Sequence, residues 1–429
     1  MINTRRYIYF VCLSLLLLNT WCSQAQTDTS FARKAITLDQ YLSLVGKQNL
    51  NYVAAQYNVR IAAAGMESAK VFPDPELSIG SYDNQQSTMH LGRGYSAGIS
   101  TTVELGGKRR ARIDLAGSQV SLSNALLQDF FRNLRADAAM DYFNAIQQYN
   151  LFRVLENSYA TMKQLADADS IRFKLGVITD IDARQSRLEA GNLLNRLFQS
   201  EAEWKVTLVQ LRLNTGSRQA DTFLFPSGNL KPLHRDFSLA ALINEAQVIR
   251  ADAIVAQNAK TVAEKSLLLT KANRRLDLGI SAGIQYAGEA TNETAPTPAY
   301  RSLNAGISIP LKFSNLYKGA IKADNYAIQQ SEVQYEQILL QIQTEVTQAY
   351  LNYKAAEKQV AQYEKGLLLE SDKVLAGKMY SYKRGETALL EVLNAQRTYN
   401  EVQQNYYQSL YGYAAALIAL ERSAGIWDL

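Results

Sequence analysis

Cysteine and histidine are scarce in this chain of 429 residues. It has two cysteines, Cys12 and Cys22, and two histidines, His90 and His234. Both cysteines lie within the first 25 residues, which have the features of a removable leader, so the mature chain would form no disulfide. Two isolated histidines also leave no dense site for a soft transition metal. We therefore expect no cofactor, no resident metal and a fold stabilised by packing and association.

The first 25 residues show the order of a secretory signal peptide. Arg5 and Arg6 precede an apolar run over 7–18, and small residues follow at Ser23 and Ala25. A run of about a dozen apolar residues is too short to cross a bilayer as a helix. The pattern therefore predicts export of the chain.

Lipidation of Cys22 is the alternative fate of this leader. A small residue usually precedes a lipidated cysteine, whereas Trp21 precedes this one. We therefore favour cleavage of residues 1–25 and a mature chain that begins near Gln26.

Charge and long apolar runs are also limited. The formal net charge of +5 falls to +3 when the two leader arginines are removed, which is too little to indicate nucleic-acid binding. After the leader no run of about 18 apolar residues occurs, so no helix is expected to cross a membrane. Contact with lipid would therefore have to use β-strands in a closed barrel.

Proline is absent from two long stretches of the chain, 76–225 and 311–429. Because proline inside a helix costs about 3 kcal/mol, its absence permits unusually long helices. A single helix over 108–172 would be roughly 100 Å long at 1.5 Å per residue. An ordinary helical bundle is the alternative, but helices of globular proteins seldom exceed about 20 residues. So long a helix needs neighbours along its whole length, which favours an assembly.

Two short segments recur with a spacing of about 208 residues. The segment 97–100 (AGIS) is repeated at 305–308, and 173–176 (FKLG) resembles 382–385 (YKRG). The repetition predicts an internal duplication in which each half contains a helix, two strands, a very long helix, a tight turn and a helix. The expected divisions are a signal peptide (1–25), a first repeat (26–215), a connector (216–237), a second repeat (238–423) and a C-terminal tail (424–429).

Four segments alternate apolar and polar residues with the period of a β-strand. They lie at 75–82, 95–105, 276–286 and 303–312. About ten residues is the length of a strand in a membrane barrel, and such barrels need at least about eight strands. Four strands per chain therefore predict that several chains contribute to one barrel. A small soluble sheet with one buried face is the alternative.

Two motifs superficially indicate enzymes, but both lack required partners. The segment 279–283 (GISAG) matches a hydrolase nucleophile motif, yet it lies in an alternating strand and both histidines precede it. The segment 106–108 (GGK) is followed by Arg109, where a phosphate-binding loop requires Ser or Thr. We therefore do not expect an enzyme.

Two further segments carry a resemblance to a known family. The segment 104–112 (ELGGKRRAR) resembles the strand-to-helix junction of the CzcC-like, metal-efflux branch of the TolC family of outer-membrane efflux proteins. The segment 382–397 is similar to the helix-turn-helix at the periplasmic tip of that family. The resemblance implies a mixed α/β membrane protein: a homotrimeric 12-stranded β-barrel, four strands per chain, continued by a long α-helical barrel.

The same resemblance implies a function in the outer membrane, with the helical part extending into the periplasm. It implies a passive exit duct of a tripartite efflux pump for metal cations or small toxic compounds. The implied partners are a periplasmic adaptor protein, an inner-membrane RND-type pump, outer-membrane lipid and two further copies of the chain. Two alternatives stay open: a duct for type I protein secretion, and a coiled-coil envelope protein that does not conduct.

The resemblance also implies roles for residues at the periplasmic tip. Asp180 and Tyr382 match positions that link neighbouring helices and keep the aperture closed, while Thr387 stands where some members have an arginine. Glu391 and Asn394 match a ring at the constriction, of which only Glu391 is acidic here. A helix cap for Asp180, ordinary packing for Tyr382 and a solvated carboxylate for Glu391 are the alternatives from the residues alone.

Overall fold

The computed structural model describes residues 32–85, 90–218, 222–228, 230, 234–312 and 316–428. The expected leader and both cysteines fall outside these ranges. Cleavage before Gln26 therefore stays a prediction.

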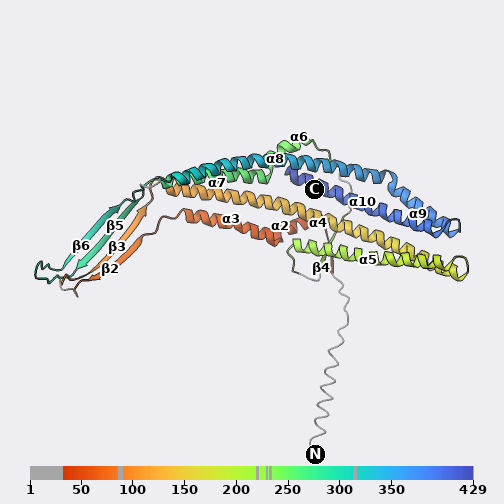
Figure 1. Ribbon diagram of the computed structural model, residues 1–429, viewed down its shortest axis with the longest axis horizontal. Helices are drawn as coiled ribbons and strands as arrows, with labels where there is room; N and C mark the ends of the chain where they lie inside the picture. Colours follow the sequence, from red (N-terminus) through yellow and green to blue (C-terminus); the bar gives the residue numbers. More distant parts are fainter. Residues whose placement is uncertain are drawn as a thin grey trace, which may run out of the picture.

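The chain is elongated, with its strands at one end and two helical hairpins at the other (Figure 1). Long helices run between these ends, and a small second sheet lies beside them near the middle of the molecule. No helix within the described ranges is both long and apolar enough to cross a membrane.

The strands at the far end form one antiparallel sheet with the order β2-β3-β5-β6. They are β2 (Glu76–Asp83), β3 (Arg93–Val103), β5 (Leu278–Ala287) and β6 (Tyr300–Ser308). All four predicted strands are confirmed, with shifted ends. The last begins at Tyr300 because it stays paired with β5 as far as Ala287. β5 begins at Leu278, the last residue paired with β3, and the preceding Asp277 forms an ion pair with Lys108 at 2.5 Å.

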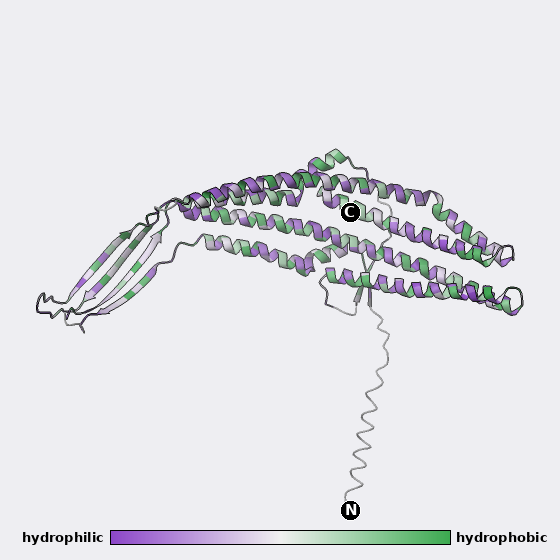
Figure 2. Cartoon of the chain, in the orientation of Figure 1, coloured by the Kyte–Doolittle hydropathy of each residue, from purple (hydrophilic) through white to green (hydrophobic). Residues whose placement is uncertain are grey.

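The strand register separates the two faces of this sheet. One face carries large apolar side chains, including the row Ile79, Ala97, Ile284 and Leu303. The other carries mainly glycine and small polar residues, including the row Ser78, Gly98, Gly283 and Asn304. Figure 2 shows the resulting alternation of hydrophilic and hydrophobic residues along the strands. Leu303 is 81% exposed in the single chain, so this apolar face is uncovered.

Helices of matching length appear in the two halves of the chain. The first half has α2 (Leu38–Gln48), α3 (Leu50–Ala69), α4 (Lys108–Lys174) and α5 (Asp180–Asn214). The second half has α6 (Leu239–Ile249), α7 (Ala251–Asn273), α8 (Lys318–Gln362), the π-helix η1 (Tyr363–Leu367), α9 (Leu368–Lys383) and α10 (Leu389–Ala424). The predicted duplication and the long helix from 108 are therefore confirmed. α4 has 67 residues, about 100 Å at 1.5 Å per residue.

The second long helix is interrupted, which the absence of proline did not indicate. A π-helical turn separates α8 from α9, and Gly366 within it has a φ of 151°. This conformation is open to glycine but strained for other residues. The helix therefore bends at Gly366, a common consequence of a π-bulge.

A small parallel sheet was also missed by the sequence analysis. β1 (Ala32–Ile36) pairs with β4 (Thr222–Pro226), which lies in the expected connector. Tyr142 of α4 donates its hydroxyl proton to the carbonyl of Ile36 or Ser227, at 2.9 and 2.8 Å. The two strands are too short to show an alternating pattern, so only their pairing across the chain defines them.

The main hydrophobic core surrounds this small sheet. It combines residues of every neighbouring element, including Ile36, Tyr41, Tyr142, Trp204, Phe223, Leu242, Val346 and Leu417. A second cluster lies toward the hairpin tips and includes Met162, Leu193, Tyr382, Val392 and Leu393. The core therefore holds the middle of the chain together, and a separate apolar contact joins the hairpins.

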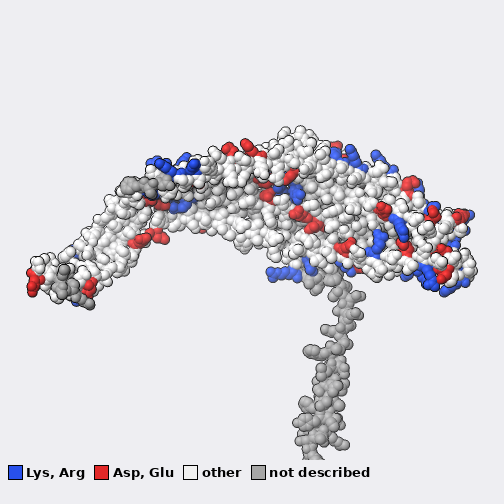
Figure 3. Space-filling model, in the orientation of Figure 1, with Lys and Arg blue, Asp and Glu red and all other residues white. Residues whose placement is uncertain are grey.

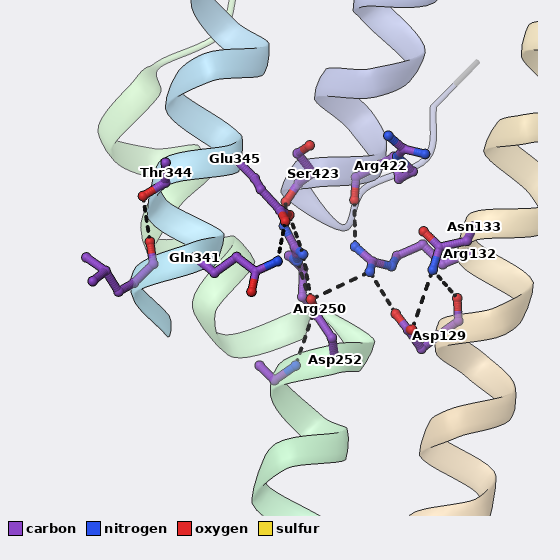
Figure 4. Close-up of polar contacts among 12 residues, drawn as sticks. Asp129, Arg132, Asn133, Arg250, Asp252, Gln341, Thr344, Glu345, Arg422 and Ser423 are labelled. Carbon is purple, nitrogen blue, oxygen red and sulfur yellow. Dashed lines mark hydrogen bonds and ion pairs between the residues drawn. The ribbon is translucent and has the colours of Figure 1, made fainter. Parts of the chain in front are cut away.

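Arg250, at the break between α6 and α7, binds two other helices (Figure 4). Its guanidinium lies 2.5 Å from Asp252 and 2.7 Å from Glu345 of α8, and it donates to the carbonyl of Ser423 at 2.9 Å. Asn49 occupies the corresponding break between α2 and α3 and donates to the carbonyl of Asn214 at 2.9 Å. In both halves, therefore, the side chain at the break between the first two helices donates to a carbonyl at the C-terminal end of the last helix, α5 or α10.

Candidate periplasmic gate

The two hairpins end in tight turns of the same form. α4 and α5 are joined through Gly176, with a φ of 73°, and α9 and α10 through Gly385, with a φ of 79°. The left-handed conformation suits glycine at the end of a helix. Thr179 caps α5 by accepting a hydrogen bond from the Asp182 backbone N–H at 3.1 Å, whereas Ala388 stands at the same place before α10.

Tyr382 connects the two hairpins through a buried hydrogen bond. Its hydroxyl group, on α9, donates to Oδ1 of Asp169 on α4 at 3.0 Å. Asp169 is fully buried and Tyr382 is 5% exposed. Arg172 completes the cluster: its guanidinium lies 3.6 Å from Asp169 and 4.9 Å from the centre of the Tyr382 ring. This cluster of Asp169, Arg172 and Tyr382 is called the hairpin link below.

Burial makes Asp169 easier to protonate than an ordinary aspartate. Desolvation raises the pKa of this carboxyl group, and the Tyr382 hydrogen bond and the Arg172 charge oppose that rise without cancelling it. The nearby carboxylate of Asp182 adds to the rise. Burial and the Asp169 charge likewise raise the pKa of Tyr382, so its phenol stays protonated and available as a donor.

Within the described chain, the carboxylate partner of Tyr382 is therefore Asp169 and not Asp180. A role of Asp180 at the aperture stays a prediction. Asp180 begins α5 and binds Arg184 of its own helix at 2.6 Å. Both side chains are substantially exposed, at 44% and 68%. A carboxylate in the first turn interacts favourably with the helix dipole, so the geometry of Asp180 is that of a helix-terminal residue.

Thr387 lies beside the second turn, two residues before α10. Its hydroxyl oxygen is buried and has no hydrogen-bond partner within the described residues. The side chain thus makes no link to the other hairpin in this chain.

Glu391 and Asn394 share an exposed face of α10, three residues apart. Glu391 is not an isolated carboxylate, because Nζ of Lys378 on α9 lies 3.0 Å from its Oε2. The side chains of Lys378 and Glu391 are 39% and 51% exposed, so water screens the pair. Lys378 therefore places a positive charge beside Glu391, the acidic residue expected to form part of the ring.

Asp169 and Lys378 are the tip residues that the sequence analysis missed. A signal for Asp169 was present, since it continues the buried positions Ser158, Met162, Leu165 and Ala166 of α4 at helical spacing. A carboxylate at such a position indicates burial against a polar partner. Nothing in the sequence brings Lys378 to Glu391, because their contact depends on how α9 packs against α10.

The motif at 279–283 is structural. Ser281 lies within β5, and its hydroxyl group contacts the carbonyl of Gly306 at 3.3 Å across the pair of strands. In the described part of the chain, no three histidine, cysteine or acidic residues are grouped so that they could hold a metal ion.

Comparison with known proteins identifies the family. The model of the outer membrane efflux protein family matches residues 41–217 and again 242–426. These two matches cover most of the chain and correspond to its two halves. The chain therefore belongs to the outer membrane efflux protein family, as the resemblance to TolC-type proteins implied. Members of this family are efflux channels of the outer membrane and not enzymes, and the helical part of this chain extends into the periplasm.

Individual relatives support the same conclusion. The cobalt-zinc-cadmium resistance protein CzcC of Cupriavidus metallidurans is 26% identical over 436 residues, which cover 98% of this chain and all of the relative. Among solved structures, CusC has a TM-score of 0.73 at 18% identity and covers 91% of this chain and 92% of its own. The open state of the Neisseria gonorrhoeae MtrE outer membrane channel has a TM-score of 0.70 at 15% identity, with 91% and 89% covered.

Proposed function

We propose that three copies of this chain form the exit duct of a tripartite pump that expels divalent metal cations. A periplasmic adaptor protein and an inner-membrane RND-type pump would supply the energy and the substrate. Under this proposal residues 26–215 and 238–423 are two repeats of one unit, joined by the connector 216–237. The full-length similarity to a cobalt-zinc-cadmium resistance protein supports the choice of metal cations over other cargo.

The four-stranded sheet is the main observation that supports a channel shared by several chains. Its apolar face is uncovered, its other face is lined by glycine and small polar residues, and the outer strands β2 and β6 each have one unpaired edge. An exposed apolar face and two open edges are unstable in isolation. Three copies supply twelve strands, which suffice to close a barrel around the small polar residues.

We propose that the hairpin link keeps the periplasmic end closed. A hydrogen bond between α4 and α9 opposes separation of the two hairpins, and the apolar cluster around Tyr382 acts in the same direction. Asp180 and Thr387 would have no part in this bond within one chain. Glu391 and Asn394 would face the pore in threefold-repeated positions, with Lys378 reducing the charge of each carboxylate.

Two measurements test the proposal. Purified full-length protein should migrate as a trimer in mild detergent and conduct ions across a planar bilayer. Deletion of the gene in its host should lower tolerance of Co²⁺, Zn²⁺ and Cd²⁺, and the intact gene should restore it. If the protein conducts ions but deletion of its gene leaves metal tolerance unchanged, the assignment as a channel stands and the assignment of metal cations as its cargo is rejected. A monomer that stays soluble without detergent would reject both.

A further inference from the structure

The apolar face of the sheet is almost free of charge along its length. Its rows run Leu77, Ile99, Ala282, Ala305; then Ile79, Ala97, Ile284, Leu303; then Ser81, Tyr95, Tyr286, Arg301. Among the described strand residues, the charged side chains of this face (Asp83, Arg93 and Arg301) all lie toward the end that carries the loops, far from the helices. The side of the strand region that is seen in Figure 3 is largely uncharged between its two ends.

Arg301 is the cation of this face that lacks an acidic neighbour. It is exposed, its partner across the strands is Tyr286, and its own strand β6 is at the edge of the sheet. Within the described residues it forms no ion pair. Arg93, the other cation of this face, lies directly opposite Asp83 on the paired strand. Arg93 therefore has a carboxylate at the opposite strand position, whereas Arg301 has a tyrosine there.

A depression of about 680 Å³ adjoins Arg301 on this face. Ile79, Ile284 and Leu303 provide apolar lining, while Tyr95, Tyr286 and Arg301 lie toward the loop end. Apolar lining next to two tyrosines and a guanidinium fits an acyl chain attached to an anionic headgroup. Tyrosines are typical of the level at which a membrane meets water, and a cation on the lipid face is tolerated near that level.

The position in the membrane decides which leaflet is involved. The helices extend from the opposite end of the strands into the periplasm, so the loop end with Arg301 lies at the outer surface of the cell. Phosphorylated glycolipid forms the outer leaflet of a bacterial outer membrane. The guanidinium group binds phosphate through two parallel hydrogen bonds, a geometry that no other side chain offers.

We propose that Arg301, flanked by Tyr95 and Tyr286, binds the phosphate of an outer-leaflet glycolipid whose acyl chain lies over Ile284 and Leu303. This inference depends on the membrane location of the family and is independent of the metal cargo and of the gate. The bound lipid would cover the depression and seal the sheet at the outer surface.

The test compares two forms of one lipid that differ only in phosphate. Purified full-length oligomer in non-ionic detergent is titrated with diphosphorylated lipid A and with the same lipid after removal of its phosphates. Bound lipid per chain is counted by native mass spectrometry. The wild-type protein should prefer the phosphorylated form. Arg301→Gln should weaken binding of that form about fivefold, the effect expected of one cation at a membrane surface, and leave the other unchanged.

Two variants control this result. Arg93→Gln removes the same charge from the same face and should bind both lipids like the wild type, because Arg93 is not among the residues that line the depression and lies opposite the carboxylate-bearing Asp83. Arg301→Lys should keep part of the preference, since it retains the charge without the planar fork. Equal binding of both lipids by the wild type would overturn the proposal, as would equal losses in Arg93→Gln and Arg301→Gln.

The open edge of β6 offers one competing explanation, in which Arg301 contacts a neighbouring copy. In that case Arg301→Gln would lower the melting temperature of the oligomer equally with either lipid. This outcome would also reject the lipid assignment. A loss of stability confined to the phosphorylated lipid supports it.

Discussion

At the scale of single residues, a few polar side chains within apolar helix faces decide how the hairpins are joined. Asp169 and Tyr382 lie 213 positions apart and meet in a buried contact between α4 and α9. A buried carboxylate without a partner would be costly, so the hydrogen bond and the contact between the hairpins depend on each other. Opening the hairpins would break both.

Tyr382→Phe should therefore increase the fraction of open channels. The substitution removes the donor to Asp169 and leaves the ring. The packed form, in which the two hairpins are in contact, therefore loses about 1.5–3 kcal/mol of stabilisation per chain, the value of a hydrogen bond to a charged acceptor. A change of about 1.4 kcal/mol shifts an equilibrium tenfold. Single-channel recording in planar bilayers measures the open fraction. Asp180→Ala is the matched control and should conduct like the wild type, because among the described residues its side chain pairs with Arg184 of its own helix and not with the other hairpin. An equal rise in the open fraction of both variants would show that Asp180 also holds the gate closed.

The gate should also respond to pH through Asp169. Burial raises the pKa of this carboxyl in the packed form, so the packed form holds a proton more tightly than an opened form in which Asp169 meets water. The packed form is therefore favoured as the pH falls through the raised pKa toward the ordinary value of about 4. We expect conductance to decline over that interval. Asp169→Asn, which cannot ionise, should abolish the decline, and a decline that survives in this variant must come from another group.

Ion selectivity should depend on the balance between Glu391 and Lys378. Lys378→Gln leaves the carboxylate unpaired and should raise the preference for cations, because a ring of carboxylates concentrates cations in a narrow pore. Glu391→Gln leaves the lysine and should shift the preference toward anions. Reversal potentials in a salt gradient measure both changes. If both variants keep the wild-type reversal potential, neither side chain faces the narrow part of the pore.

At the scale of elements, residues at the breaks between helices bind neighbouring helices in each half of the chain. Arg250 is 2% exposed and joins α7, α8 and α10, while Asn49 at the corresponding break of the first half makes fewer contacts. Figure 4 shows that Arg132 of α4 extends the same network, donating to the carbonyl of Arg422 at 2.9 Å. The end of α10 is therefore capped by Arg132 of α4 and by Arg250 at the break between α6 and α7.

Arg250→Met should destabilise the chain strongly. Removing one partner of a fully buried ion pair costs about 3–5 kcal/mol. The loss here should lie near the lower end of that range, because Asp252 keeps Arg132 at 3.7 Å and the Glu345 side chain is 36% exposed. Asn49→Ala is the comparison and should cost about 1 kcal/mol, the usual value of a lost helix cap. The thermal loss of helical circular dichroism in detergent measures both. Similar melting temperatures for the two variants would show that solvent enters the network around Arg250.

At the scale of the whole molecule, the two faces of the sheet have opposite surroundings. The apolar face must meet lipid and the face of glycine and small polar residues must meet the pore if three copies close a barrel. Figure 1 places the sheet at one end of the long helices and the hairpin tips at the other, so membrane contact and the hairpin link occur at opposite ends. The longest helix, α4, has 67 residues and is about 100 Å long.

Adjacent residues of β5 test this arrangement. Ala282→Arg places a cation on the apolar face, where it should cost about 2–4 kcal/mol near the middle of the membrane. We expect this variant to accumulate outside the outer membrane and to form little trimer. Ser281→Arg places the same group on the polar face and should assemble normally, with altered conductance. Membrane fractionation and gel migration without heating measure assembly, and a reversed order of the two variants would invert the faces of the sheet.

The sequence by itself determined the long helix from Lys108, the four strands and the duplication. These features depend on local patterns: the absence of proline, alternation with period two, and short segments that recur after about 208 residues. Period two fixes which residues share a face of a strand, so the two faces of the sheet were also predictable. The ends of the strands were not, since pairing with β5 extends β6 to Tyr300.

Only the tertiary structure decided the contacts between distant parts of the chain. β1 and β4 are five residues each and exist because they pair with one another. The choice of Asp169 over Asp180 depends on which position of α4 faces α9, and the pairing of Lys378 with Glu391 depends on the packing of α9 against α10. A sequence pattern records the period of an element, but not the rotation of one helix relative to another, and that rotation sets which charges meet.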